Sequence, residues 1–162
     1  MVDVPTISIV VASASVVAGV IYYFLQIQHQ KKMRQTDLVM RLYDRFSSNE
    51  FQDAWAKARK RGREYEIIDD MDGVEEKVGG FREFNQVSLF FEGVGILLKR
   101  KIVDKAMIED LFGGAVERAW ENLKAGIIKG RKQYGDPTIY YYFEYLYDEM
   151  KKEEQQPASK TI

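Results

Sequence analysis

The stretch FREFNQVSLFFEGVGILLKRK, residues 81–101, decides how the rest of the chain must fold. Its apolar and small residues recur at spacings of three and four, the period of one face of an α-helix. This face comprises Phe81, Phe84, Ser88, Phe91, Gly95 and Leu98, and Val87, Phe90, Val94 and Leu97 widen it. A helix that is apolar on most sides must be buried, so we predict the central helix of an all-α bundle, from about Gly73 to Lys101. Gly93 and Gly95 are expected where another helix approaches closely.

Glu92 is the single charged residue within the apolar segment 87–98. A carboxylate among apolar neighbours needs a cation or hydrogen-bond donors, or it takes up a proton. Glu92 is therefore either a structural carboxylate held by such a partner, or a functional carboxylate that works with a basic residue such as Arg118 or Arg131.

Short signals predict where the neighbouring helices begin and end. Ser47 and Glu50 match the S-x-x-E capping box at the start of a helix. Asp104 is expected to cap a short helix that the pair Gly113 and Gly114 breaks, and a longer helix is expected from residue 115 to residue 134.

The last helix is expected to begin at Asp136, with Pro137 in its first helical position. Its core face is predicted to consist of Phe143, Leu146, Tyr147 and Met150. Tyr140, Tyr141 and Tyr142 cover the other sides, and core packing does not require aromatic residues all round a helix. We therefore predict a partner-binding surface at these three tyrosines.

The N-terminal segment 4–28 contains no charged residue and is long enough, at about 1.5 Å per residue, to cross a bilayer core of about 30 Å. A cleavable signal peptide is the alternative, because Ala12, Ser13 and Ala14 resemble a cleavage site. However, no Lys or Arg precedes the apolar run, and the run continues beyond Ala14. We expect a permanent transmembrane anchor over residues 1–28 that continues as a helical stalk.

Charges on either side of the anchor predict its orientation. Lys31, Lys32 and Arg34 follow it, whereas Asp3 stands alone before it. By the positive-inside rule the N-terminus is outside the cell membrane, and residues 29–151 form a cytoplasmic bundle of about five helices. The polar residues 152–162 are expected to be a disordered tail.

The segment KARKRGR, residues 57–63, is strongly basic. Its cations are Lys57, Arg59, Lys60, Arg61 and Arg63, and with Lys31, Lys32 and Arg34 they are predicted to contact the membrane surface. A solvated helix end is the equally favoured alternative. Nucleic acid is not an expected partner, because the segment lacks interleaved aromatic residues and a recognisable reading helix.

Composition excludes several kinds of chemistry. The chain has no Cys, and His29 is its single histidine, so a thiolate site, a Ser-His-Asp triad and an HExxH zinc site are all excluded within one chain. The acidic stretch at residues 69–77 fails as an EF-hand loop, because the first and last ligand positions are Ile68 and Gly79. We expect no metal site and no cofactor.

Several separate motifs resemble one known family. They are FSSNEF at residues 46–51, FNQVSLFFEGVGILLKRKIVD at residues 84–104, a helix that carries Trp120, and FEYL at residues 143–146. Together they are similar to family 4760 of the domains of unknown function. The resemblance implies a short, membrane-anchored helical protein of prokaryotes, and it brings no activity or catalytic residue with it.

These features favour an interaction or scaffold module at the inner membrane surface. Its partners would be membrane lipid and either an unknown protein or a second copy of the chain. Two alternatives remain: a membrane-tethered enzyme that uses Glu92, and a membrane-active effector. An enzyme is the less favoured expectation.

Overall fold

The computed structural model describes residues 3–62, 64 and 81–154, and only the backbone of residues 4–11, 153 and 154. Within these ranges the chain forms five helices and no strand, so the prediction of an all-α fold is confirmed. It divides into two compact units, Met1–Leu38 and Val39–Ile162. Helix α1, Val4–Ser47, contributes to both units and confirms the prediction of one long N-terminal helix.

The N-terminal unit, Met1–Leu38, is helical from Val4 onward. Its apolar side chains from Val16 to Leu25 are exposed. Among the side chains that the structure describes, no helix has a stretch both long enough and apolar enough to cross a membrane. The predicted span over residues 1–28 is thus not supported there, and residues 1–2 and the side chains of residues 4–11 lie outside the described part.

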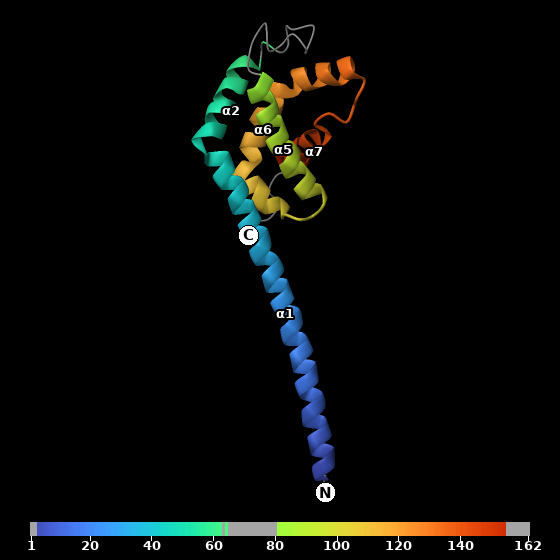
Figure 1. Cartoon of the computed structure of the whole chain (residues 1–162). Coiled ribbons are helices and arrows are strands. Elements are labelled where there is room, and N and C mark those ends of the chain that lie inside the picture. The colour runs from blue at the N-terminus through green and yellow to red at the C-terminus, as the bar shows by residue number, and fades with distance from the viewer. Residues whose placement is uncertain (1–2, 63, 65–80, 155–162) are drawn as a thin grey trace. The chain divides into compact units, whose positions relative to one another are not determined.

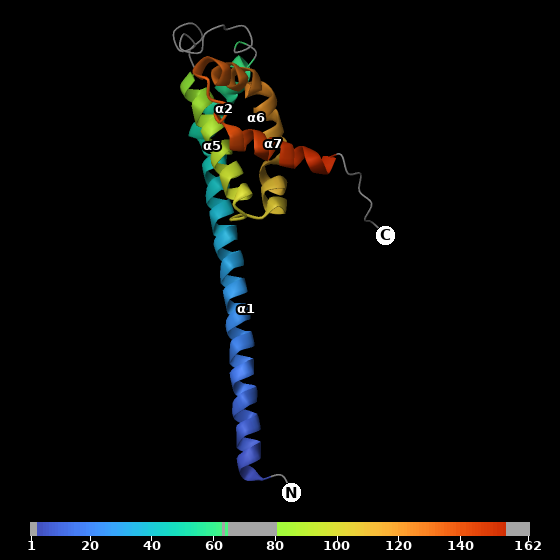
Figure 2. The same ribbon diagram turned by 90° about the vertical axis from the view of Figure 1, so that its right-hand side faces the viewer.

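The second unit is built around one central helix. Besides the end of α1 it contains α2 (Asn49–Arg61), α5 (Phe81–Lys99), α6 (Lys105–Tyr134) and α7 (Tyr141–Glu154). Helix α5 packs against α2, α6 and α7, as Figures 1 and 2 show from two directions. The prediction that this segment forms the centre of the bundle is therefore confirmed.

Aromatic side chains join the helices of this unit in one core. The ring centroids of Phe51 on α2 and Phe90 on α5 lie 4.7 Å apart, and the next ring along, Phe91, stacks on Phe143 of α7 at 5.1 Å. Trp120 of α6 meets Phe143 edge to face at 5.1 Å. Each large ring buries much apolar surface, so this cluster contributes to the stability of the unit.

The predicted helix boundaries at Ser47 and at the pair Gly113 and Gly114 are wrong. The cap of α2 is Ser48 rather than Ser47, because the Ser48 hydroxyl accepts the hydrogen bond from the Phe51 amide at 3.3 Å. The predicted break at Gly113 and Gly114 does not occur, and α6 continues through both residues. Asp104, by contrast, caps α6 as predicted, accepting from the Ala106 amide at 2.9 Å.

Candidate functional site

The guanidinium group of Arg131 holds the loop between α6 and α7. Its Nε donates to the carbonyl of Ile139 at 2.8 Å, and Nη2 donates to the carbonyl of Tyr140 at 3.3 Å. Its Nη1 donates to Oε2 of Glu144, in the first turn of α7, at 2.7 Å. The side chain of Arg131 is 16% exposed, so these charge-assisted hydrogen bonds form largely out of water.

Glu92 supports the same turn of α7 from the other side. Its Oε2 accepts a hydrogen bond from the backbone N–H of Phe143 at 2.7 Å. The first N–H groups of a helix lack partners within the helix, and a negative charge beside them is favourable. Glu92 is therefore satisfied by a backbone donor and not by Arg118 or Arg131, and this geometry fits the structural interpretation of the carboxylate.

The predicted start of the last helix at Asp136 is wrong. The Asp136 carboxylate accepts from the amide and the hydroxyl of Thr138, at 2.8 and 2.6 Å, which forms a local turn and lowers the pKa of Asp136. Helix α7 begins only at Tyr141 because Tyr140 has a φ of 52°, in the left-handed region. The cap of α7 comes instead from Glu92.

Tyr140 is half-buried between α5 and α6. Its hydroxyl donates a hydrogen bond to Oδ1 of Asn85, and its ring lies 6.2 Å from Phe84 in an edge-on arrangement. Burial, together with a smaller contribution from the nearby charge of Glu92, raises the pKa of Tyr140 to about 12. The phenol is therefore neutral at physiological pH.

The three predicted partner-binding tyrosines have different environments. Tyr141 is 48% exposed, whereas Tyr140 and Tyr142 are half-buried. The backbone of Tyr142 packs directly on Gly95 of α5, where a Cβ atom would lie 2.0 Å from the Tyr142 carbonyl oxygen. The predicted close helix approach at Gly95 is thus confirmed. The same prediction for Gly93 is wrong, because a Cβ atom there would meet nothing within 4 Å.

The predicted membrane-contact cations are distributed over both units. Those of the N-terminal unit, Lys31, Lys32 and Arg34, are exposed. In the second unit, Lys57 forms an exposed ion pair of 3.4 Å with Glu83. The last turn of α2 contains Arg59, Lys60 and Arg61, and Arg63 lies outside the described residues. Their contact with a membrane stays a prediction.

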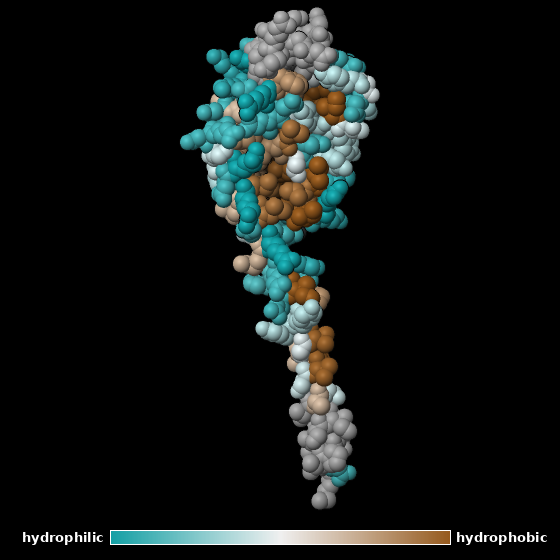
Figure 3. Space-filling view, in the orientation of Figure 1, coloured by the Kyte–Doolittle hydropathy of each residue, from teal (hydrophilic) through white to brown (hydrophobic). Residues whose placement is uncertain are grey.

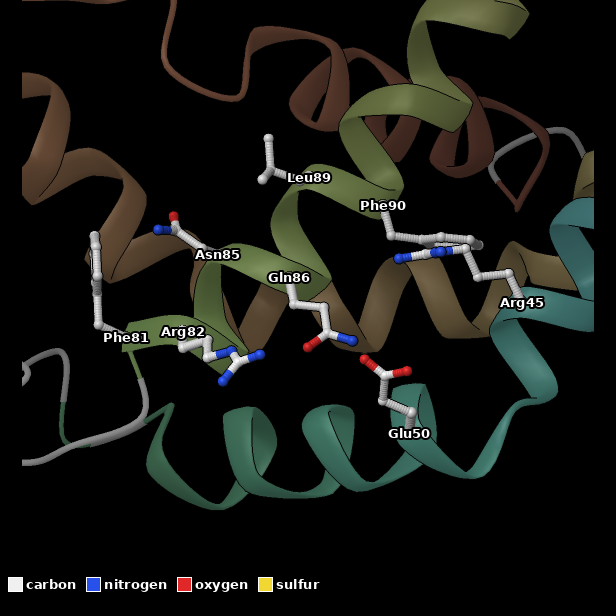
Figure 4. A pocket seen from close by; sticks show the side chains of 8 residues that line it. All are labelled: Arg45, Glu50, Phe81, Arg82, Asn85, Gln86, Leu89 and Phe90. Atoms are coloured by element: carbon white, nitrogen blue, oxygen red, sulfur yellow. The ribbon is translucent and has the colours of Figure 1, made fainter.

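A groove of about 680 Å³ lies where the corner between α1 and α2 faces α5. The lining residues are Arg45, Glu50, Phe81, Arg82, Asn85, Gln86, Leu89 and Phe90. In Figure 4 Glu50 points toward Gln86, with Arg82 on one side of this pair and Arg45 on the other. Leu89 is 60% exposed. Figure 3 shows apolar side chains gathered on the face of the unit where α5 lies.

The sequence analysis did not single out Arg45 or Arg82. Neither guanidinium has an ion-pair or hydrogen-bond partner within the described ranges, although both line the groove. One signal was present for Arg82: it lies in the first turn of α5, where the helix dipole disfavours a cation. Arg45 offers no such signal, because a cation is favourable in the last turn of a helix.

Metal ligands do not gather in the part of the chain that the structure covers. There, no three carboxylate or histidine side chains lie close enough together to hold a metal ion. The acidic stretch at residues 69–77 lies outside the described residues.

Comparison with known proteins identifies one family. No curated protein and no solved structure matches the chain. One family model, described as "Domain of unknown function (DUF4760)", matches residues 10–150. This match covers the groove, the Arg131 contacts and the Glu92 cap, and it confirms the resemblance drawn from the motifs. The chain therefore belongs to the DUF4760 family.

Proposed function

We propose that the chain is a membrane-tethered interaction module. In this proposal residues 1–28 anchor it in the cell membrane with the N-terminus outside, and the helical unit Val39–Ile162 binds a protein partner in the cytoplasm. The observation that carries the proposal is the groove between the α1–α2 corner and α5, which combines two cations that have no ion-pair partner among the described residues with an exposed apolar side chain.

The charges of the groove indicate what kind of segment it binds. Among the described residues that line the groove, Arg45 and Arg82 stand against a single carboxylate, Glu50. Glu50 also lies in the first turn of α2, where the helix dipole already offsets part of its charge. A guanidinium group binds an incoming carboxylate through two parallel hydrogen bonds. The partner is therefore a protein segment with a carboxylate beside an apolar side chain, and the apolar side chain would pack on Leu89.

Photo-crosslinking in native membranes tests this binding site. A photoreactive amino acid at Leu89 is expected to give one adduct of defined mass, whose cross-linked peptide contains Asp or Glu within a few residues of the attachment point. The matched control is the same amino acid at Ile128, which is 43% exposed on α6 and does not line the groove. This control is expected to give no such adduct.

Charge reversal then separates a specific partner from incidental contact. Arg45→Glu and Arg82→Glu together are expected to reduce the Leu89 adduct at least tenfold, because like charges would face each other across the groove. An adduct of equal yield at both probe positions, or one that survives charge reversal, would contradict the proposal. If Tyr141→Ser abolishes the Leu89 adduct and the charge-reversal variant keeps its full yield, the partner binds on α7 instead.

The tether rests on the sequence of the first 34 residues. The segment 4–28 is uncharged, Tyr22 and Tyr23 stand near its end, and cations follow from Lys31. After alkaline extraction the full chain is expected to stay with the membrane, and Val16→Arg with Val20→Arg is expected to release it because two charges in an apolar span are costly. Recovery of the unaltered chain in the soluble fraction, or of a mature form without its first two dozen residues, would remove the tether.

A further inference from the structure

A separate cavity of about 180 Å³ lies between α5, α6 and the loop that precedes α7. Its walls are mainly apolar, and they include Phe84 of α5, Ile127 of α6 and Ile139 of the loop. Phe84 and Ile127 are almost completely buried, so the cavity borders the core of the unit. It shares Phe81 and Asn85 with the groove, but its other walls belong to Phe84, α6 and the loop.

Two positions of α6 that line the cavity have no side chain. Gly126 and Gly130 are both buried and both line the cavity. A Cβ atom at Gly130 would meet nothing within 4 Å, although the residue itself is buried. Glycine is, after proline, the least favourable residue inside a helix. Helix α6 thus leaves open a space that an ordinary helix-forming residue would narrow.

One wall of the cavity is polar. There the Tyr140 hydroxyl donates to Oδ1 of Asn85, so the phenol oxygen can still accept a hydrogen bond and the Asn85 amide nitrogen can still donate one. Tyr140 is held in this position by a left-handed backbone, whose carbonyl accepts from Arg131. Such strained residues concentrate at binding sites. The raised pKa of Tyr140 has burial as its main cause, in keeping with a dry wall.

The cavity is partly open. Tyr134, near the end of α6, lines the cavity and is 52% exposed. Part of the cavity wall therefore reaches the surface of the unit. Aromatic rings on several sides favour a flat aromatic guest, because rings pack edge to face or in offset stacks.

We propose that this cavity binds a small, neutral, monocyclic aromatic compound that carries one hydroxyl group. At the packing density of protein interiors, about 0.74, a space of 180 Å³ holds about eight non-hydrogen atoms. Apolar cavities of about 150 Å³ bind benzene, so the size is sufficient. The single hydroxyl of the guest would bond to the pair formed by Asn85 and Tyr140. The proposal is independent of the groove and of the membrane tether.

Methyl NMR of the full chain with added phenol tests the proposal. Phenol is expected to produce saturable shifts of the Ile127 and Ile139 methyl signals, with the Ile128 methyl group unchanged as an internal control. Ile128 follows Ile127 directly, but it is exposed and does not line the cavity. Shifts that do not saturate, or shifts as large at Ile128, would overturn the proposal. Tight binding of 2-naphthol, which exceeds the space, would do the same.

A filled cavity supplies the second arm of the test. Gly130→Val is expected to weaken phenol binding at least tenfold, because the new side chain occupies the cavity. The matched control is Gly93→Val, also on a helix and also at a position where a Cβ meets nothing within 4 Å. It is expected to bind phenol as the unaltered chain does. If Gly130→Val fails to fold, Gly130→Ala replaces it, and unchanged phenol affinity in that variant would count against the site.

Discussion

Replacing Gly95 with alanine is expected to lower the free energy of unfolding by about 3 kcal/mol, the upper part of the range for overpacked cores. The new Cβ atom would lie 2.0 Å from the carbonyl oxygen of Tyr142 and 2.7 Å from its carbonyl carbon. Backbone atoms inside a helix cannot move aside as a flexible side chain can. Helices α5 and α7 must therefore separate, which also opens the contact between Phe91 and Phe143.

Tryptophan fluorescence during urea unfolding measures this effect, because Trp55 and Trp120 are both buried in the same unit as Gly95. The control is Gly93→Ala, two positions along the same helix, where a Cβ meets nothing within 4 Å. This control is expected to be neutral or to gain up to about 1 kcal/mol, since alanine is the better helix former. Equal unfolding midpoints for the two variants would show that α5 and α7 do not approach as closely at Gly95 as the structure places them.

The central helix could be recognised from the sequence because its signal is local. Residues 81–99 show an apolar period of three to four, and burial on most sides follows directly from that pattern. The Asp104 cap is equally local, since donor and acceptor are two residues apart. Local signals of this kind can be read from the sequence because no distant partner needs to be known.

The glycine pair at 113 and 114 shows why other predictions failed. Glycine costs about 1 kcal/mol per residue inside a helix, which is enough to break an isolated helix. Here Phe112 and Val116 on either side are fully buried, and the free energy of their burial outweighs the cost. Propensity read from the sequence cannot include this contribution before the neighbouring helices are known.

The start of α7 was missed because its cap is not local. Glu92 and the Phe143 amide are 51 residues apart in sequence and 2.7 Å apart in space. The groove has the same character, since Arg45 comes from α1 and Arg82 from α5. Glu92 could be recognised as a carboxylate that needed a partner, but the identity of that partner required the fold.

Replacing Arg131 with alanine is the other change expected to have a large effect, about 3 kcal/mol. Hydrogen bonds to charged groups contribute about 1.5 to 3 kcal/mol each, and Arg131 makes three that are not additive. Its loss would leave the carbonyl group of Ile139 without its donor, and the carbonyl group of Tyr140 with the Glu144 amide as its remaining donor. The stability of Arg131→Lys is expected to lie between that of the unaltered chain and that of Arg131→Ala, because lysine keeps the charge but lacks the planar guanidinium group.

Hydrogen exchange shows whether this loss acts on α7 in particular. If Arg131 fixes the first turn of α7, the Phe143 amide, which donates to Glu92, is expected to exchange at least tenfold faster in Arg131→Ala. The Phe51 amide, which donates to Ser48 at the start of α2, is expected to be much less affected, because the hydrogen bonds of Arg131 run to the loop before α7 and to Glu144. Lys132→Ala, at the next and exposed position of α6, is expected to change stability by less than about 0.5 kcal/mol. Equal acceleration of exchange at the Phe143 and Phe51 amides would mean that Arg131 stabilises the unit as a whole. An Arg131→Ala variant as stable as Lys132→Ala would mean that Glu92 alone suffices to hold α7.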